Sequence, residues 1–212
     1  MNRNLPFFPN FILLAVLLLL TSCAAVEPEQ EQVAISSIKT ITIFPVQTVE
    51  VAHHFNDDIK NQLEAGVYTM TSLLTQYFAG IQSEISFQFI SNKQMESLLG
   101  KHQGNLFSQA RFVSSQMNSD AVLLITLERF RERDGTQYSV EAPASVSFEY
   151  KLLKSDGPQI LCNGVFEETQ VPLTDNIFTL KKAKKRGFKW ITAEDLAREG
   201  IKEKFGACPY LK

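Results

Sequence analysis

The sequence predicts an α+β fold, an α/β sandwich in which helices pack on a mixed sheet that ends in an antiparallel meander. Three observations lead to this prediction. Strand and helix patterns alternate along the first part of the folded region. Residues 121–125 are apolar throughout, which is typical of a central strand covered on both faces. The last three strands are separated by short polar turns, which favour antiparallel neighbours.

The first elements alternate in type. Residues 38–49 are rich in β-branched side chains and predict a strand. Pro45 indicates that the far end of this strand lies at an edge of the sheet. Residues 59–79 carry apolar side chains at helical spacing, and Gly80 is the expected stop. Residues 85–90 alternate between apolar and polar side chains, which predicts a half-buried strand.

Two helices then lead to the apolar strand. Ser91 and Gln94 have the spacing of a capping box in front of a short helix over 92–99. A second helix is expected over 106–117, and the central strand over 121–130.

Turn residues and alternating apolar and polar side chains predict the antiparallel meander. The turn signal at 134–135 precedes a long alternating segment, 138–154, and the turn at 156–158 leads into a strand over 160–168. The apolar positions expected to share one face of the long segment are Tyr138, Val140, Ala142, Ala144, Val146, Phe148 and Tyr150. Pro143 interrupts this ladder and indicates an edge or a bulge.

The chain ends with two expected helices, 176–185 and 192–205. Thr192 and Asp195 have capping-box spacing at the start of the second helix. Residues 38–212 therefore form one expected domain of about 175 residues, a size that buries roughly 70% of the unfolded-chain surface.

The N-terminal segment 1–22 has the order of a secretory signal, with Arg3 before the apolar run 11–20. That run is too short to span a bilayer as a helix. The residues Leu-Thr-Ser-Cys at 20–23 resemble a bacterial lipobox, which implies cleavage before Cys23 and attachment of lipid to its sulfur and amine. The alternative is an ordinary cleaved signal that happens to carry a cysteine.

The lipoprotein resemblance implies a location. Ala24 follows the cysteine, and lipoproteins without aspartate at this place usually reach the outer membrane, so we expect an anchored protein facing the periplasm. Residues 23–37 predict a tether, because the acidic and polar residues 27–32 within it have nothing to bury and repel one another. Its residues after Cys23 reach at most roughly 46 Å when extended.

Two cysteines, Cys162 and Cys208, remain beyond Cys23. An oxidising periplasm favours a disulfide between them, and the alternative is two unpaired thiols with Cys162 buried. The formal net charge is −2, so neither composition nor compartment favours nucleic-acid binding.

The order of elements over 38–168 resembles an α/β module of bacterial envelope proteins. The resemblance depends on residues 41–45, 89–99 and 110–130. The group includes the amino-terminal domain of the Tol–Pal β-propeller protein, the curli secretion lipoprotein and lipoprotein activators of penicillin-binding proteins. It implies a non-enzymatic scaffold that docks on other envelope proteins.

Two clusters are candidates for chemistry. His53 and His54 with Asp57 and Asp58 have metal-ligand side chains, but adjacent strand residues face opposite ways, and an aspartate cap on the next helix is the simpler interpretation. A basic run near the C-terminus consists of Lys181, Lys182, Lys184, Lys185, Arg186 and Lys189, followed by Trp190. This run could bind an anionic ligand or a membrane surface, or it could be a solvated helix end.

The sequence therefore predicts a membrane-anchored lipoprotein that binds a partner or assists assembly in the cell envelope. The alternative is a lipid, lipopolysaccharide or glycan binding protein that uses residues 181–189. Motifs for nucleophilic, phosphate or zinc chemistry are absent from the sequence, so we expect no enzyme activity, no cofactor and no metal.

Overall fold

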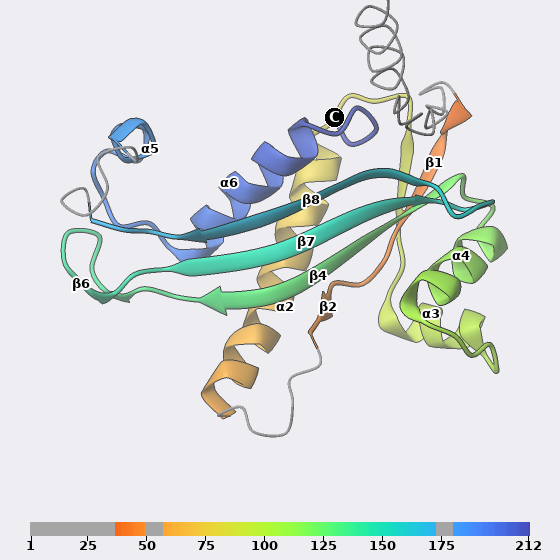
Figure 1. The fold of residues 1–212 in the computed structure, drawn as a ribbon, viewed down its shortest axis with the longest axis horizontal. Helices are drawn as coiled ribbons and strands as arrows, with labels where there is room; N and C mark the ends of the chain where they lie inside the picture. The colour runs from red at the N-terminus through yellow and green to blue at the C-terminus, as the bar shows by residue number, and fades with distance from the viewer. Residues whose placement is uncertain (1–36, 50–56, 173–179) are drawn as a thin grey trace, which may run out of the picture. The chain divides into compact units, whose positions relative to one another are not determined.

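The computed structural model describes residues 37–49, 57–172 and 180–212. Helices pack on both faces of a mixed sheet, which confirms the predicted α+β fold (Figure 1). The helices are α2 (Asp57–Ala79), α3 (Asn92–Leu99), α4 (Leu106–Gln116), α5 (Leu180–Lys185) and α6 (Ala193–Gly206). The strands are β1 (Thr40–Ile43), β2 (Gln47–Thr48), β3 (Ser86–Phe89), β4 (Ala121–Arg131), β5 (Asp134–Gly135), β6 (Val140–Ala142), β7 (Ser145–Lys154) and β8 (Ile160–Thr169).

The main sheet has the strand order β3-β1-β4-β7-β8, and β2 pairs with β4 beside this path. Strand β1 is parallel to both β3 and β4. Strands β4, β7 and β8 are antiparallel neighbours, so the predicted C-terminal meander is confirmed. A separate hairpin, β5–β6, follows β4.

Strand β4 is the centre of the structure because both of its faces are covered. Its first five residues are at most 3% exposed, as the apolar run predicts. Leu123 and Ile125 belong to the core under α2 and α6, whereas Val122 and Leu124 belong to the core under α3 and α4. The alternation of side chains along a strand thus supplies two separate cores.

Two predicted strands are shorter than expected because prolines interrupt them. The segment 38–49 splits into β1 and β2, with Pro45 between them. The long segment 138–154 splits into β6 and β7 at Pro143, which has no N–H for the ladder. Consequently Tyr138 does not share the buried face of Phe148, and it is 71% exposed.

The helix boundaries follow the predicted ones closely. Helix α2 begins at Asp57, so its two aspartates lie in the first turn of the helix, where their charge is favourable. Ser91 and Gln94 form the expected capping box of α3. Thr192 caps α6 and accepts a hydrogen bond from the Asp195 N–H. Residues 176–179 of the other expected helix lie outside the described residues.

The last helix is fastened to the sheet in two ways. A disulfide joins Cys162 on β8 to Cys208 just after α6, with the two Cα atoms 6.0 Å apart. Gly200 lets α6 approach β8 closely, since a Cβ at this position would lie 2.6 Å from the Phe166 ring. None of the helices within the described ranges combines the length and the apolar character that a membrane span requires.

Candidate functional site

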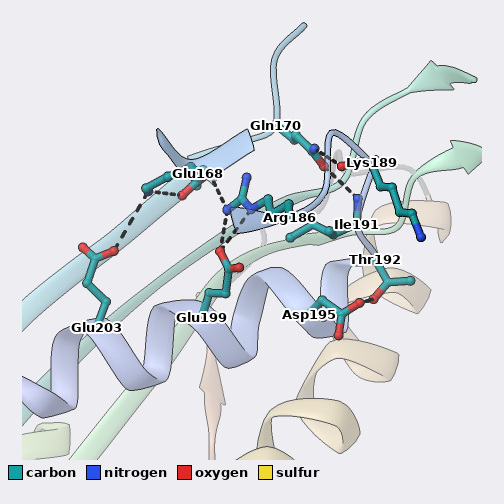
Figure 2. A network of polar contacts seen from close by, with 10 residues as sticks. Glu168, Gln170, Arg186, Lys189, Ile191, Thr192, Asp195, Glu199 and Glu203 are labelled. Atoms are coloured by element: carbon teal, nitrogen blue, oxygen red, sulfur yellow. Dashed lines mark hydrogen bonds and ion pairs between the residues drawn. The ribbon is translucent and has the colours of Figure 1, made fainter. Parts of the chain in front are cut away.

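The basic run forms α5 and the start of the loop that leads to α6, residues 186–192, which we call the α5–α6 loop. Arg186 fastens this loop to the fold (Figure 2). Its side chain is only 4% exposed, and its Nη2 lies 2.8 Å from Glu168 Oε1 and 2.6 Å from Glu199 Oε2. Lys182 adds an ion pair to Glu168 at 2.6 Å.

The ion pairs hold these groups in their charged forms. Burial disfavours the Glu168 carboxylate, but the hydrogen bond from Lys182 and the charge of Arg186 outweigh burial and lower the pKa of Glu168. Burial likewise disfavours the Arg186 cation, but the hydrogen bond to Glu199 and the charge of Glu168 raise its pKa. Arg186 is therefore a structural cation and is not presented to an external ligand.

Further hydrogen bonds hold the loop backbone (Figure 2). Gln170 donates from Nε2 to the Lys189 carbonyl at 2.7 Å and accepts from the Ile191 N–H at 2.9 Å. The β5–β6 region adds two hydrogen bonds to the backbone of Trp190. The Trp190 N–H donates to the Gln137 carbonyl, and the Trp190 carbonyl accepts from the Arg133 side chain. The loop is thus fixed from both ends.

Phe188 is the unusual residue in this rigid loop. Its φ is +57°, a conformation that L side chains other than asparagine, aspartate and histidine rarely adopt. Its side chain is nevertheless 60% exposed, so no burial of the ring compensates for the strained backbone. Backbone strain of this kind is typical of functional positions.

Exposed cations flank Phe188 in the sequence, and a second aromatic residue lies beside the neighbouring Lys189. Lys189 Nζ is 5.9 Å from the ring centre of the exposed Tyr138. The exposed lysines of the run are Lys181, Lys184, Lys185 and Lys189, and none of them forms an ion pair with another described residue. We call Tyr138, Phe188 and these four lysines the Phe188 surface.

The structure divides the six predicted cations into two groups. Arg186 and Lys182 hold the loop, and the other four are exposed. Neither Phe188 nor Tyr138 was predicted from the sequence as a functional residue. Phe188 had a detectable signal, because it follows Gly187 inside a charged run; Tyr138 had none, because it reaches Lys189 only through the fold.

The remaining predicted residues lie elsewhere. Cys23, His53 and His54 are outside the described residues. Within residues 37–49, 57–172 and 180–212, no group of three or more histidine, cysteine, aspartate or glutamate side chains is arranged to hold a metal ion.

Neither a family model nor a curated protein matches this chain. Several solved structures are similar to it. The PelC dodecamer of Paraburkholderia phytofirmans matches with 10% identity and a TM-score of 0.47, over 82% of this chain and 88% of that one. The lipoprotein GNA1162 of Neisseria meningitidis matches with 15% identity and a TM-score of 0.38, over 70% and 95%.

The C-terminal domain of LpoB from Escherichia coli matches with 12% identity and a TM-score of 0.38, over 64% of this chain and 93% of that one. The similar structures thus include a bacterial lipoprotein. At TM-scores below 0.5 these likenesses carry no argument about function, which depends on the residues of this chain.

Proposed function

We propose that this chain is a lipoprotein of the bacterial envelope, acylated at Cys23, whose folded region binds an acidic surface of another envelope protein through the Phe188 surface. The observation that carries the proposal is Phe188, an exposed aromatic side chain on a strained and firmly held backbone. The resemblance of residues 20–23 to a lipobox supports the anchor and the outer-membrane location facing the periplasm.

Rigidity is what makes Phe188 suited to recognition. Arg186 and Gln170 hold the loop before any partner arrives, so little conformational entropy is lost on binding. Aromatic residues supply a large share of interface energy when a partner buries them. The exposed lysines of the Phe188 surface would steer an acidic partner and would set its orientation.

The position of the Phe188 surface also favours a protein partner. The N–H groups of Lys39 and Thr40, where the chain enters the fold, donate to Asp120 at the start of β4. Trp190 is held by the β5–β6 region, which follows the other end of β4. Eleven strand residues span roughly 34 Å. The lysines therefore lie far from the side on which the tether joins the fold.

The mode of action that we propose is binding without catalysis. In the described part of the chain, the polar side chains that hold the α5–α6 loop are already paired: Arg186 with Glu168 and Glu199, and Gln170 with the loop backbone. These groups are structural, and the exposed lysines and aromatics offer contact area and charge.

Site-directed photocrosslinking on intact cells tests the proposal. A benzophenone amino acid at position 188 should give a discrete higher-mass adduct of this chain with one envelope protein. Position 68 is the matched control, because Tyr68 is also a surface aromatic residue, 82% exposed, but lies on α2. Changing the four exposed lysines to glutamine should remove the adduct. An equal adduct from both positions, or none from 188, would contradict the proposal.

A second candidate function is binding of an anionic lipid, lipopolysaccharide or glycan. The four exposed lysines favour it, since each cation contributes about 1 kcal/mol near an anionic surface. The chain from Ala24 onward, which lacks the acylated cysteine, can be sedimented with vesicles. Binding to phosphatidylglycerol vesicles but not to phosphatidylcholine vesicles, lost in the lysine variant, would support this candidate over the first.

A further inference from the structure

We propose a second binding site on the other face of the sheet, where Arg111 receives the carboxylate of an acidic peptide segment. An open cavity of about 460 Å³ lies between α4 and the β7–β8 turn. Asn105, Ser108 and Arg111 line one side of it, and Leu153, Pro158 and Ile160 line the other. Its volume lies within the range of ligand sites, 300 to 1,000 Å³.

Arg111 has an unfulfilled hydrogen-bonding requirement. Its Nε is buried and has no hydrogen-bond partner among the described residues. Leaving a buried donor of a charged group unpaired is unfavourable, so such an atom indicates a missing acceptor. Arg129, Arg186 and Arg198 differ from it, since each pairs with a carboxylate of this chain.

The missing acceptor is best supplied by a carboxylate. A guanidinium presents parallel N–H groups that match the two oxygens of a carboxylate. A second buried atom without a partner among the described residues is the hydroxyl oxygen of Ser155, in the same β7–β8 turn that contributes Pro158 to the cavity.

The surroundings favour a peptide over a small anion. Ile160 lines the cavity and is 46% exposed, and together with Pro158 it offers contact to an apolar side chain. Ile160 is also the first residue of β8, the outermost strand on its side of the sheet, which pairs only with β7 among the described strands. An extended peptide can add its backbone to such an edge while its carboxylate reaches Arg111.

The walls of the site are already ordered. Asn105 caps α4, and its Oδ1 accepts from the Ser108 N–H at 2.9 Å. Phe107, which also lines the cavity, lies under Lys151, whose Nζ is 5.6 Å from the ring centre. Ligand binding therefore needs little rearrangement of α4.

Fluorescence anisotropy with the full mature protein in a zwitterionic detergent tests the site. The probe is a labelled acetyl-Leu-Glu-Leu-Leu-amide peptide, and the matched probe has Gln in place of Glu. We expect saturable binding of the first peptide and at least tenfold weaker binding of the second. Arg111→Gln should reduce affinity at least tenfold, whereas Arg198→Gln, on the exposed surface of α6, should leave it unchanged.

Equal affinity for the two peptides would overturn the proposal, as would an Arg111→Gln variant that is correctly folded by circular dichroism and binds within twofold of the unsubstituted protein. The absence of saturable binding of the Glu peptide would also overturn it. The Arg111 site shares no residue with the Phe188 surface. Crosslinking from position 188 in the Arg111→Gln variant therefore reports separately on the first proposal.

Discussion

The two faces of the sheet differ in how they are held together. On the α2–α6 face, the Phe205 ring lies 5.0 Å from that of Tyr150 and 5.5 Å from that of Tyr77, and a disulfide fastens the end of α6 to β8. On the α3–α4 face, the helices are short, and each of the eight residues of α3 keeps some exposure. The first face stabilises the fold, and the second leaves room for a cavity.

This difference explains how binding features can coexist with a stable domain. A large aromatic core on one face supplies stability through buried apolar area. The smaller core on the other face tolerates a buried donor without a partner in the described chain, Arg111 Nε. Four experiments would break or sharpen the comparison.

Removal of the disulfide should have the largest effect. Replacing Cys162 and Cys208 with serine frees a loop with a sequence separation of 46 residues, which lowers the free energy of unfolding by about 4 kcal/mol in the chain-entropy model. Urea denaturation followed by circular dichroism measures the change. The unsubstituted protein in reducing buffer should lose the same free energy of unfolding as the serine variant. A loss below about 1 kcal/mol would show that the disulfide does not account for the difference between the two faces.

Gly200→Ala should have the next largest effect, because its Cβ would meet the Phe166 ring at 2.6 Å. Overpacking of this kind lowers the free energy of unfolding by about 1–3 kcal/mol. Gly206→Ala is the matched control on the same helix, since nothing lies within 4 Å of the added Cβ. It should be neutral or slightly stabilising in the same urea titration, and equal losses for both variants would argue against close packing at Gly200.

Two helix caps compare the faces directly. Ser91→Ala and Thr192→Ala each remove a cap hydrogen bond worth about 1 kcal/mol. We expect Thr192→Ala to lower global stability by that amount, because α6 unfolds with the main core. Ser91→Ala should change global stability less and should accelerate hydrogen exchange within α3. Identical global losses without faster exchange in α3 would show that both faces unfold as one.

The pH dependence around Glu168 should be the smallest effect, since Lys182 is about half exposed. The pKa of Glu168 is lowered in the folded state, so its ionised form stabilises the fold above its unfolded pKa of about 4.3, and this contribution disappears as pH falls through the folded pKa. Melting temperature should therefore fall less steeply between about pH 5 and 3 in Glu168→Gln than in the unsubstituted protein. Parallel curves would show that Glu168 adds no pH dependence.

Local patterns in the sequence predicted much of the fold. The apolar run of β4, the antiparallel meander and the caps at Ser91 and Thr192 were all correctly expected. Each depends on residues within one element or across one short turn. The insertion of β1 between β3 and β4 was not predicted, because parallel pairing joins segments that are far apart in the chain.

The candidate sites were predicted less completely. The sequence identified the basic run, but it could not show that Arg186 is buried, because Glu168 and Glu199 come from β8 and from α6. It contained no sign of the Arg111 cavity, whose walls belong to two elements that meet only in the folded chain.

The sequence by itself determined the type of most elements, the two caps and the expectation of an anchored N-terminus, because periodicity and capping act between near neighbours. Tertiary structure alone decided which cations are neutralised and which remain exposed. The reason is that a charge is paired or free according to what the fold brings within about 4 Å of it, and those partners come from distant parts of the chain.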